Sequence, residues 1–229
     1  MDPGFEILYE EGPCLVVCKP PGLSTQAPAG IDSLEVRIKA FLRERDRRPG
    51  YVYLGVPHRL DRPASGAIVF GKHSRAARRL ARQFEHRLVK KTYWAGVEGL
   101  VTPPAGAWED YLRKIPGQAR AEVVAPDHAD ARLARLNYRT LASACGVTWL
   151  EIELLTGRTH QVRIQAAARG HALLGDAQYG ATLPFGPQHE DERLRAIALH
   201  ARTLEFRHPM TKQIVCITAP LPEFWPALR

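Results

Sequence analysis

The residues best placed to do chemistry in this chain form the run His58-Arg59-Leu60-Asp61-Arg62. One carboxylate stands between two guanidinium groups, and fixed cations nearby favour the ionised form of a carboxyl group. An ionised carboxylate suits a nucleophile or an electrostatic anchor better than a general acid. The alternative interpretation is a surface cluster of ion pairs, most of which have little energetic effect.

A second dense polar run follows later in the chain, Thr156-Gly157-Arg158-Thr159-His160-Gln161-Val162-Arg163. Glycine permits a sharp turn, and the start of a helix offers unpaired backbone N–H groups to an anion. The alternative is an ordinary turn between a strand and a helix, decorated with solvated arginines. A loop with Gly175, Asp176 and Gly180 comes next and is more often structural than catalytic.

The elements around these runs must position them. An apolar segment at 67–70 predicts a strand directly after the first run. If that extended geometry reaches back, side chains alternate and Arg59 and Asp61 point to the same side. The second run leads into a helix expected at 161–169, with Gly170 placed to end it.

Strands outnumber helices and show no regular alternation with them. Further helices are expected at 33–48 and from about residue 74. Strands are expected at 15–18, 91–97, 108–115, 119–124, 136–142, 147–155, 204–207 and 214–218. This order predicts an α+β, mostly antiparallel architecture. The length of 229 residues allows one large domain or two small ones, and we expect a single domain over 1–229.

A formal net charge of +8 predicts an anionic partner, with nucleic acid as the leading candidate. Two basic clusters could contact phosphates or could be solvated surface: one lies within 37–48, and the other holds Arg75, Arg78, Arg79 and Arg82. The four cysteines and nine histidines show no metal-ligand spacing, so no metal site is expected. No stretch approaches the ~20 apolar residues that span a bilayer, and the N-terminus is unlike a signal peptide. We therefore expect a cytoplasmic protein without a membrane partner.

Three pieces in this order resemble the RluA-type family of pseudouridine synthases. They are His58 to Arg62 with Ser65-Gly66, then Lys91-Thr92-Tyr93, then Thr156 to Arg163 with Gly175-Asp176 and Tyr179-Gly180. Two flanking pieces, Val17 to Gly22 and Leu199 to His208-Pro209, also resemble this family. The resemblance implies a long, bent, mixed and mostly antiparallel sheet, with flanking helices and a central basic cleft.

The resemblance also implies the activity, in which a uridine in rRNA or tRNA is isomerised to pseudouridine without a cofactor or a metal. Asp61 matches the catalytic aspartate, Tyr93 the tyrosine that packs on the base, and Arg163 the basic residue that pairs with the aspartate. Arg59 matches the arginine that enters the RNA stack when the uridine is flipped out. The remaining substrate-binding candidates in the two motifs are His58, Arg62, Arg158, His160 and Gln161.

The chain departs from the usual family pattern in three residues. Pro63 and Ala64 stand where the family often has Asp-Thr, and Gln165 stands where a histidine is common. The chain begins almost directly with catalytic-domain sequence, so an N-terminal S4 RNA-binding domain is not expected. We lean towards a monomer.

Two other functions remain open at this point. The first is an RNA-binding protein or folding chaperone without catalysis, which would need positive charge rather than Asp61, Tyr93 and Arg163 together. The second is an enzyme that cleaves the glycosidic bond of a small nucleoside. Such enzymes usually need a second carboxylate, for which Asp176 is a candidate.

Overall fold

The structure is a computed structural model that describes residues 3–47 and 50–227. The chain divides into two compact units. The first unit comprises the chain up to Lys90 together with Ala201–Pro222, and the second comprises Lys91–His200 and the segment after Pro222. The single catalytic domain expected from the sequence stays a prediction.

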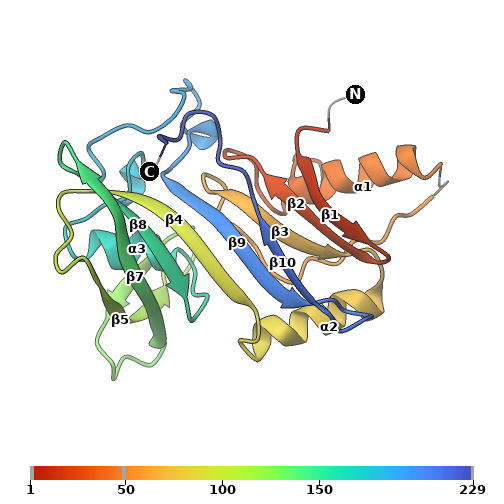
Figure 1. The fold of residues 1–229 in the computed structure, drawn as a ribbon, viewed down its shortest axis with the longest axis horizontal. Helices are drawn as coiled ribbons and strands as arrows, with labels where there is room; N and C mark the ends of the chain where they lie inside the picture. The colour runs from red at the N-terminus through yellow and green to blue at the C-terminus, as the bar shows by residue number, and fades with distance from the viewer. Residues whose placement is uncertain (1–2, 48–49, 228–229) are drawn as a thin grey trace. The chain divides into compact units, whose positions relative to one another are not determined.

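The first unit is built on antiparallel strand pairs. Its strands follow the spatial order β1 (Glu6–Glu11), β2 (Cys14–Lys19), β3 (Ser65–Gly71) and β9 (Leu199–Arg207), with β10 (Ile214–Thr218) paired to β9 (Figure 1). Strand β3 is buried along its whole length, as a central strand covered on both faces should be.

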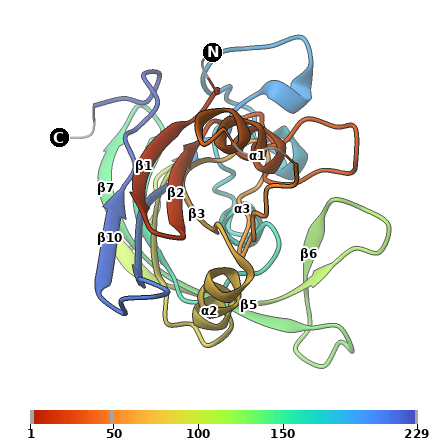
Figure 2. The same cartoon turned by 90° about the vertical axis from the view of Figure 1, so that its right-hand side faces the viewer.

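Two helices cover the strands of this unit. Helix α1 (Leu34–Arg45) begins at Ser33, whose hydroxyl accepts a hydrogen bond from the N–H of Val36. Helix α2 (Ser74–Glu85) begins at His73, whose Nδ1 accepts from the N–H of Ala76. Leu80 of α2 is fully buried in a core shared with β2, β3, β9 and β10, and α2 lies against β3 (Figure 2).

The second unit is an antiparallel array of strands with short helices. Its spatial order is β4 (Lys90–Glu98), β8 (Val147–Leu154), β7 (Arg132–Ala144), β5 (Ala105–Lys114) and β6 (Ala121–Val124). Helix α3 (Gln161–Ala167) follows β8, and two 3₁₀ turns lie at η1 (Ala177–Tyr179) and η2 (Glu192–Leu194). Ile164 fixes α3 in place by packing against Leu112, Ala121 and Ala134.

The α+β, mostly antiparallel class is confirmed. The structure differs from the sequence-based expectations in two local features. Strand β1 was not predicted, because its alternation of apolar and acidic residues is short. The regular strand after the first motif begins at Ser65, and no strand is assigned over 56–64; one isolated bridge lies just before this range, at Gly55. The strand alternation that placed Arg59 and Asp61 on one side therefore does not apply to this segment.

The segment that carries Asp61 is a loop held by the residues that follow β2. The hydroxyl of Thr25 accepts from the N–H of Leu60 at 3.1 Å and donates to the carbonyl of Leu60 at 2.9 Å. The hydroxyl of Ser24 accepts from Nε of Arg62 at 2.8 Å. Both neighbours of Asp61 are thus tied to one short stretch of chain, which fixes where the aspartate lies.

Lys19 completes this support from a position with no solvent exposure. Its Nζ donates to the carbonyls of Pro20, Leu23 and Arg62 at 2.8, 2.7 and 3.0 Å. Three acceptors match the three N–H bonds of an ammonium group. Burial lowers the pKa of Lys19 to about 7, and the negative charge of Asp61 opposes that decrease.

Gly66 lies where β3 passes close to β9. It has φ +115°, and a Cβ at this position would lie 2.4 Å from the carbonyl oxygen of Ala201 and 2.5 Å from its nitrogen. Gly12, in the turn between β1 and β2, also has a positive φ of +49°, but no atom lies within 4 Å of its added Cβ. A substitution at Gly66 would therefore cause both backbone strain and steric overlap, whereas a substitution at Gly12 would cause strain alone.

We predict that Gly66→Ala destabilises the fold by about 3 kcal/mol, because it combines an unfavourable φ with overlap against backbone. Gly12→Ala should cost only about 1 kcal/mol, since strain acts there alone. Urea unfolding of both variants checks this. Equal losses in the two variants would contradict the close approach of β3 to β9.

The burial of Lys19 predicts a dependence of stability on pH. Between pH 7 and 10.5 the unfolded chain keeps the Lys19 proton while the folded chain has released it, so stability rises with pH in this window. Relative to Lys19→Met, the wild-type free energy of unfolding should gain about 2 kcal/mol from pH 7 to pH 9. Urea unfolding of both proteins at pH 6, 7.5 and 9 measures this difference. If the free energies of unfolding of wild type and Lys19→Met change in parallel with pH, Lys19 does not titrate in this range.

Candidate functional site

Asp61 lies half-buried in the loop between Leu60, which is buried, and the start of β3. Its carbonyl accepts from the N–H of Ala64 at 3.1 Å, which closes a turn just before Ser65. The turn and the contacts of Thr25 and Lys19 hold the backbone on both sides of the carboxylate. The backbone that carries the carboxylate is therefore held in one position, and the catalytic role of Asp61 stays a prediction.

The basic neighbours of Asp61 differ in what they contact. Arg59 is exposed, and no hydrogen bond or ion pair joins its side chain to any residue within 3–47 or 50–227. His58 stacks on Phe84 of α2 at 4.2 Å between ring centroids, and its Nε2 accepts from the N–H of Val69 at 3.1 Å. His58 and Arg62 thus position the loop. Their direct contact with a substrate stays a prediction, as does that of Arg59.

Tyr93 lies on β4 in the second unit, opposite Ile152 of β8, and is 8% exposed. The neighbouring same-face residues Ala95 and Val97 are fully buried. The strand therefore sets the position of the tyrosine ring by its packing. The role of Tyr93 against a uracil base stays a prediction.

Arg163 is held by a buried, two-point ion pair with Asp176. Nε lies 2.6 Å from Oδ2 and Nη2 lies 2.7 Å from Oδ1, and the two side chains are 4% and 1% exposed. Nη2 also donates to the side-chain oxygen of Gln178 at 2.8 Å. The guanidinium lies over the ring of Tyr179, 4.9 Å from its centroid. These contacts fix the plane of the guanidinium group. A lysine at this position would supply a point charge without a fixed plane.

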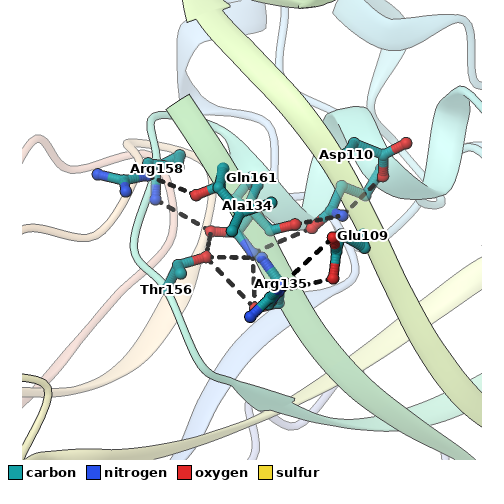
Figure 3. A network of polar contacts seen from close by, with 9 residues as sticks. Glu109, Asp110, Ala134, Arg135, Thr156, Arg158 and Gln161 are labelled. Carbon is teal, nitrogen blue, oxygen red and sulfur yellow. Dashed lines mark hydrogen bonds and ion pairs between the residues drawn. The ribbon is translucent and has the colours of Figure 1, made fainter. Parts of the chain in front are cut away.

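The turn before α3 is organised by Gln161, which is 3% exposed (Figure 3). Its oxygen accepts from the hydroxyl of Thr156 at 2.7 Å and from the N–H of Arg158 at 3.1 Å. Its amide nitrogen donates to the carbonyl of Arg135 and to the side-chain oxygen of Gln165. The amide is satisfied within the protein, so these contacts give Gln161 a positioning role, and its substrate contact stays a prediction.

Arg158 and His160 frame the same turn. Nε of Arg158 donates to the carbonyl of Leu133 at 2.9 Å. His160 has φ 52°, in the left-handed region, and its Nδ1 shares a hydrogen bond of 2.8 Å with the hydroxyl of Tyr179. That hydroxyl also accepts from the N–H of Ala121, which ties the turn to β6. A non-glycine residue held at positive φ is uncommon and marks a turn that the surrounding contacts over-determine.

Two supporting residues carry roles that the sequence reasoning did not assign. Lys19 lies in the flanking piece Val17 to Gly22 that resembles the family, and no role was expected for it from the sequence. Asp176 was considered as a second acid or base, but both of its oxygens bind Arg163. The signal for Asp176 was its place in the Gly175-Asp176 motif, which gave no partner. Asp176 was the only candidate for the second carboxylate of an enzyme that cleaves the glycosidic bond of a small nucleoside. Its pairing with Arg163 argues against that function.

The described residues contain no group of three or more His, Cys, Asp or Glu side chains placed to hold a metal ion. None of the helices in the described part of the chain combines the length and apolarity needed to cross a bilayer.

The chain matches a family model and curated relatives over most of its length. The model described as RNA pseudouridylate synthase matches residues 13–168. A ribosomal large subunit pseudouridine synthase D from Nitrosomonas europaea is 35% identical, over 98% of this chain and 64% of its own length. A tRNA pseudouridine synthase C from Salmonella typhi is 33% identical, over 96% of this chain and 87% of its own length.

A solved structure, human RNA pseudouridylate synthase domain containing 4, shares the fold with a TM-score of 0.77 at 22% identity, over 96% of this chain and 89% of that one. This chain thus spans about two thirds of one relative and most of the others. The family match covers the Asp61 loop, Tyr93 and Arg163 alike. The chain belongs to the RNA pseudouridylate synthase family.

Proposed function

We propose that this protein isomerises uridine to pseudouridine in structured RNA, with Asp61 as the catalytic carboxylate. The observation that carries the proposal is the rigid placement of Asp61 by Lys19, Ser24 and Thr25 in a chain of this family. Relatives that act on ribosomal RNA and on tRNA are both similar to this chain, so rRNA or tRNA is the proposed substrate. We further propose that it works as a monomer in the cytoplasm.

The reaction needs a carboxylate that stays charged and a uracil that can rotate within the site. The N1–C1′ bond of the uridine breaks and its electron pair stays on N1; the uracil rotates, C5 bonds to C1′, the proton on C5 leaves to solvent or a nearby base, and N1 takes up a proton. No electron is gained or lost overall, and the product has the atoms of the substrate. A carboxylate can act on C1′ as nucleophile or stabilise positive charge that develops there. A flipped-out base reaches such a group most cheaply in an unpaired region.

The arrangement of the other site residues supports distinct roles in this reaction. Tyr93, set by β4, would pack on the target base. Arg163, oriented by Asp176, would pair with Asp61 as the resemblance implies. Arg59, exposed on the same loop as Asp61, would fill the space left by the flipped nucleotide. His58, Arg62, Arg158, His160 and Gln161 would shape the surrounding surface.

The direct test of this function is a map of pseudouridines in total RNA with and without the protein. Loss of a defined modification, and its return when the wild-type gene is restored, would identify both the RNA and the uridine. An unchanged map, together with no product from rRNA or tRNA in vitro, would refute the proposal.

Asp61→Asn should abolish pseudouridine formation, because the amide cannot supply a negative charge or a nucleophilic oxygen at C1′. Its affinity for RNA should stay within about tenfold of wild type, since one carboxylate contributes little to binding a polyanion. Asp127→Asn is the matched control, because Asp127 is exposed and lies far along the chain from both motifs. Full turnover by Asp61→Asn would exclude Asp61 as the reaction centre, and tight RNA binding without any turnover in wild type would favour the chaperone.

Asp176→Asn should lower kcat by about a hundredfold with little change in KM, because Arg163 keeps its charge but loses its fixed plane. Arg163→Ala should also destabilise the fold by about 3–5 kcal/mol, since it leaves Asp176 buried without a counter-charge. Single-turnover rates and urea unfolding measure the two effects separately.

Asp110→Asn is the control for this pair. Asp110 binds Arg169 at 2.8 Å and accepts from Gln165, so it is also an acidic partner of the α3 region. Its loss should reduce stability but leave kcat within about twofold. Equal losses of kcat in Asp110→Asn and Asp176→Asn would show that α3 stability, rather than the orientation of Arg163, controls the rate.

A further inference from the structure

Helix α2 presents four arginines on one exposed face. Arg75, Arg78 and Arg82 are exposed and Arg79 is half-buried, while the opposite face buries Ala76, Ala77 and Leu80. The four side chains line a surface hollow of about 160 Å³. The helix therefore concentrates positive charge around a concave site instead of dispersing it.

The described part of the protein, 3–47 and 50–227, does not neutralise these charges. Among the residues that the structure describes, none of the four arginines forms an ion pair, and Arg79 donates to the carbonyl of Pro209 at 2.8 Å. Surface arginines elsewhere do have partners: Arg45 binds Glu10, Arg139 binds Glu151, and Arg193 binds Asp191. The face of α2 thus brings together, on one helix, four arginines for which the described residues supply no acidic partner.

The placement of the arginines works against the helix itself. Arg75 lies in the first turn, where the helix dipole favours negative charge, and no acidic residue occupies that turn. The four positions are spaced three or four residues apart, so like charges face each other along the helix and repel. Such an arrangement becomes favourable when an external anion supplies the missing negative charge.

We infer that this face of α2 binds the phosphate backbone of the RNA substrate. Guanidinium groups bind phosphate oxygens in a two-point geometry. The arginines extend over about 10 Å of helix, which suits consecutive phosphates better than one small anion. The turn after β9 is fixed to the helix by two hydrogen bonds between Gln83 and the backbone of Arg207, and it adds the exposed Arg207 and Lys212.

The same helix is tied to the loop that carries Asp61. Phe84 stacks on His58, and Leu80 packs on the strand that follows the loop. A strand of RNA held on α2 is therefore held on the support of the catalytic loop itself. This inference rests on the proposed function in one respect, namely that the polyanion is the RNA substrate.

The test compares two variants of equal charge. The face variant carries Arg75→Gln, Arg78→Gln and Arg82→Gln, and leaves Arg79 to hold Pro209. The control carries Arg37→Gln, Arg139→Gln and Arg193→Gln, which removes three arginines that are paired to acidic residues. Affinity for a labelled rRNA or tRNA fragment is measured from 50 to 400 mM salt, with kcat and KM on the same RNA.

The face variant should reduce the slope of log affinity against log salt by about 2, because about 0.7–0.9 is lost for each phosphate contact. Its KM should rise at least about tenfold while kcat stays within about twofold, and its thermal midpoint should not fall, since repulsion within α2 is relieved. The control should keep at least two thirds of the wild-type slope.

An unchanged slope in the face variant, or equal losses in both variants, would overturn the inference. An unchanged RNA slope combined with lost binding to polyglutamate would assign the face to an acidic protein segment instead, and would overturn it equally. The outcomes also separate this inference from the proposed function. Active enzyme with an unchanged slope leaves only the function standing, and a reduced slope in a protein that forms no pseudouridine leaves only the RNA surface standing.

Discussion

A single buried amino group, the Nζ of Lys19, supports the loop that carries Asp61. Lys19 ends β2, and its Nζ gathers carbonyls from its own turn and from the residue directly after Asp61. A lysine without solvent exposure is costly unless its hydrogen bonds are satisfied, and here three acceptors satisfy them. Because the donors point at backbone, the contact constrains the path of the chain and does not depend on neighbouring side chains. The strand, the turn and the loop consequently form one assembly.

The second unit also buries a basic side chain, and here an ion pair satisfies its hydrogen bonds. Arg163 and Asp176 neutralise each other in the interior, and Gln178 and Tyr179 complete the environment of the guanidinium. Replacing such a pair with apolar residues is often neutral for stability, so its presence is better explained by orientation than by energy. Each unit therefore contains a buried basic side chain: Lys19 holds a loop in the first unit, and Asp176 holds the guanidinium plane of Arg163 in the second.

Much of the fold could be predicted from the chain, because apolar periodicity reports burial. Helices α1, α2 and α3 and the strands from β2 to β10 overlap the ranges expected from the sequence, although β7 begins four residues and β9 five residues earlier than expected. The sequence motifs indicated the family, and their matching positions identified Asp61, Tyr93 and Arg163 as candidate site residues. What stayed hidden was the network of contacts between motifs. Nothing local in Lys19 or Asp176 reveals a partner 43 or 13 positions away, since such pairings depend on the tertiary path.

The hydroxyl of Thr25 has a consequence for how the site can vary. By accepting from the N–H of Leu60 and donating to its carbonyl, one side chain does the work that a neighbouring strand would do for that residue. In a sheet, the side on which a residue projects is dictated by register, and a slip of one position reverses it. A segment pinned by a hydroxyl is free of that parity rule. Because Thr25 follows β2 and Leu60 precedes β3, the direction of the Asp61 side chain depends on where β2 ends against β3 and not on a strand register within 56–64, so a slip in the pairing of these two strands would separate the hydroxyl from the loop that it holds.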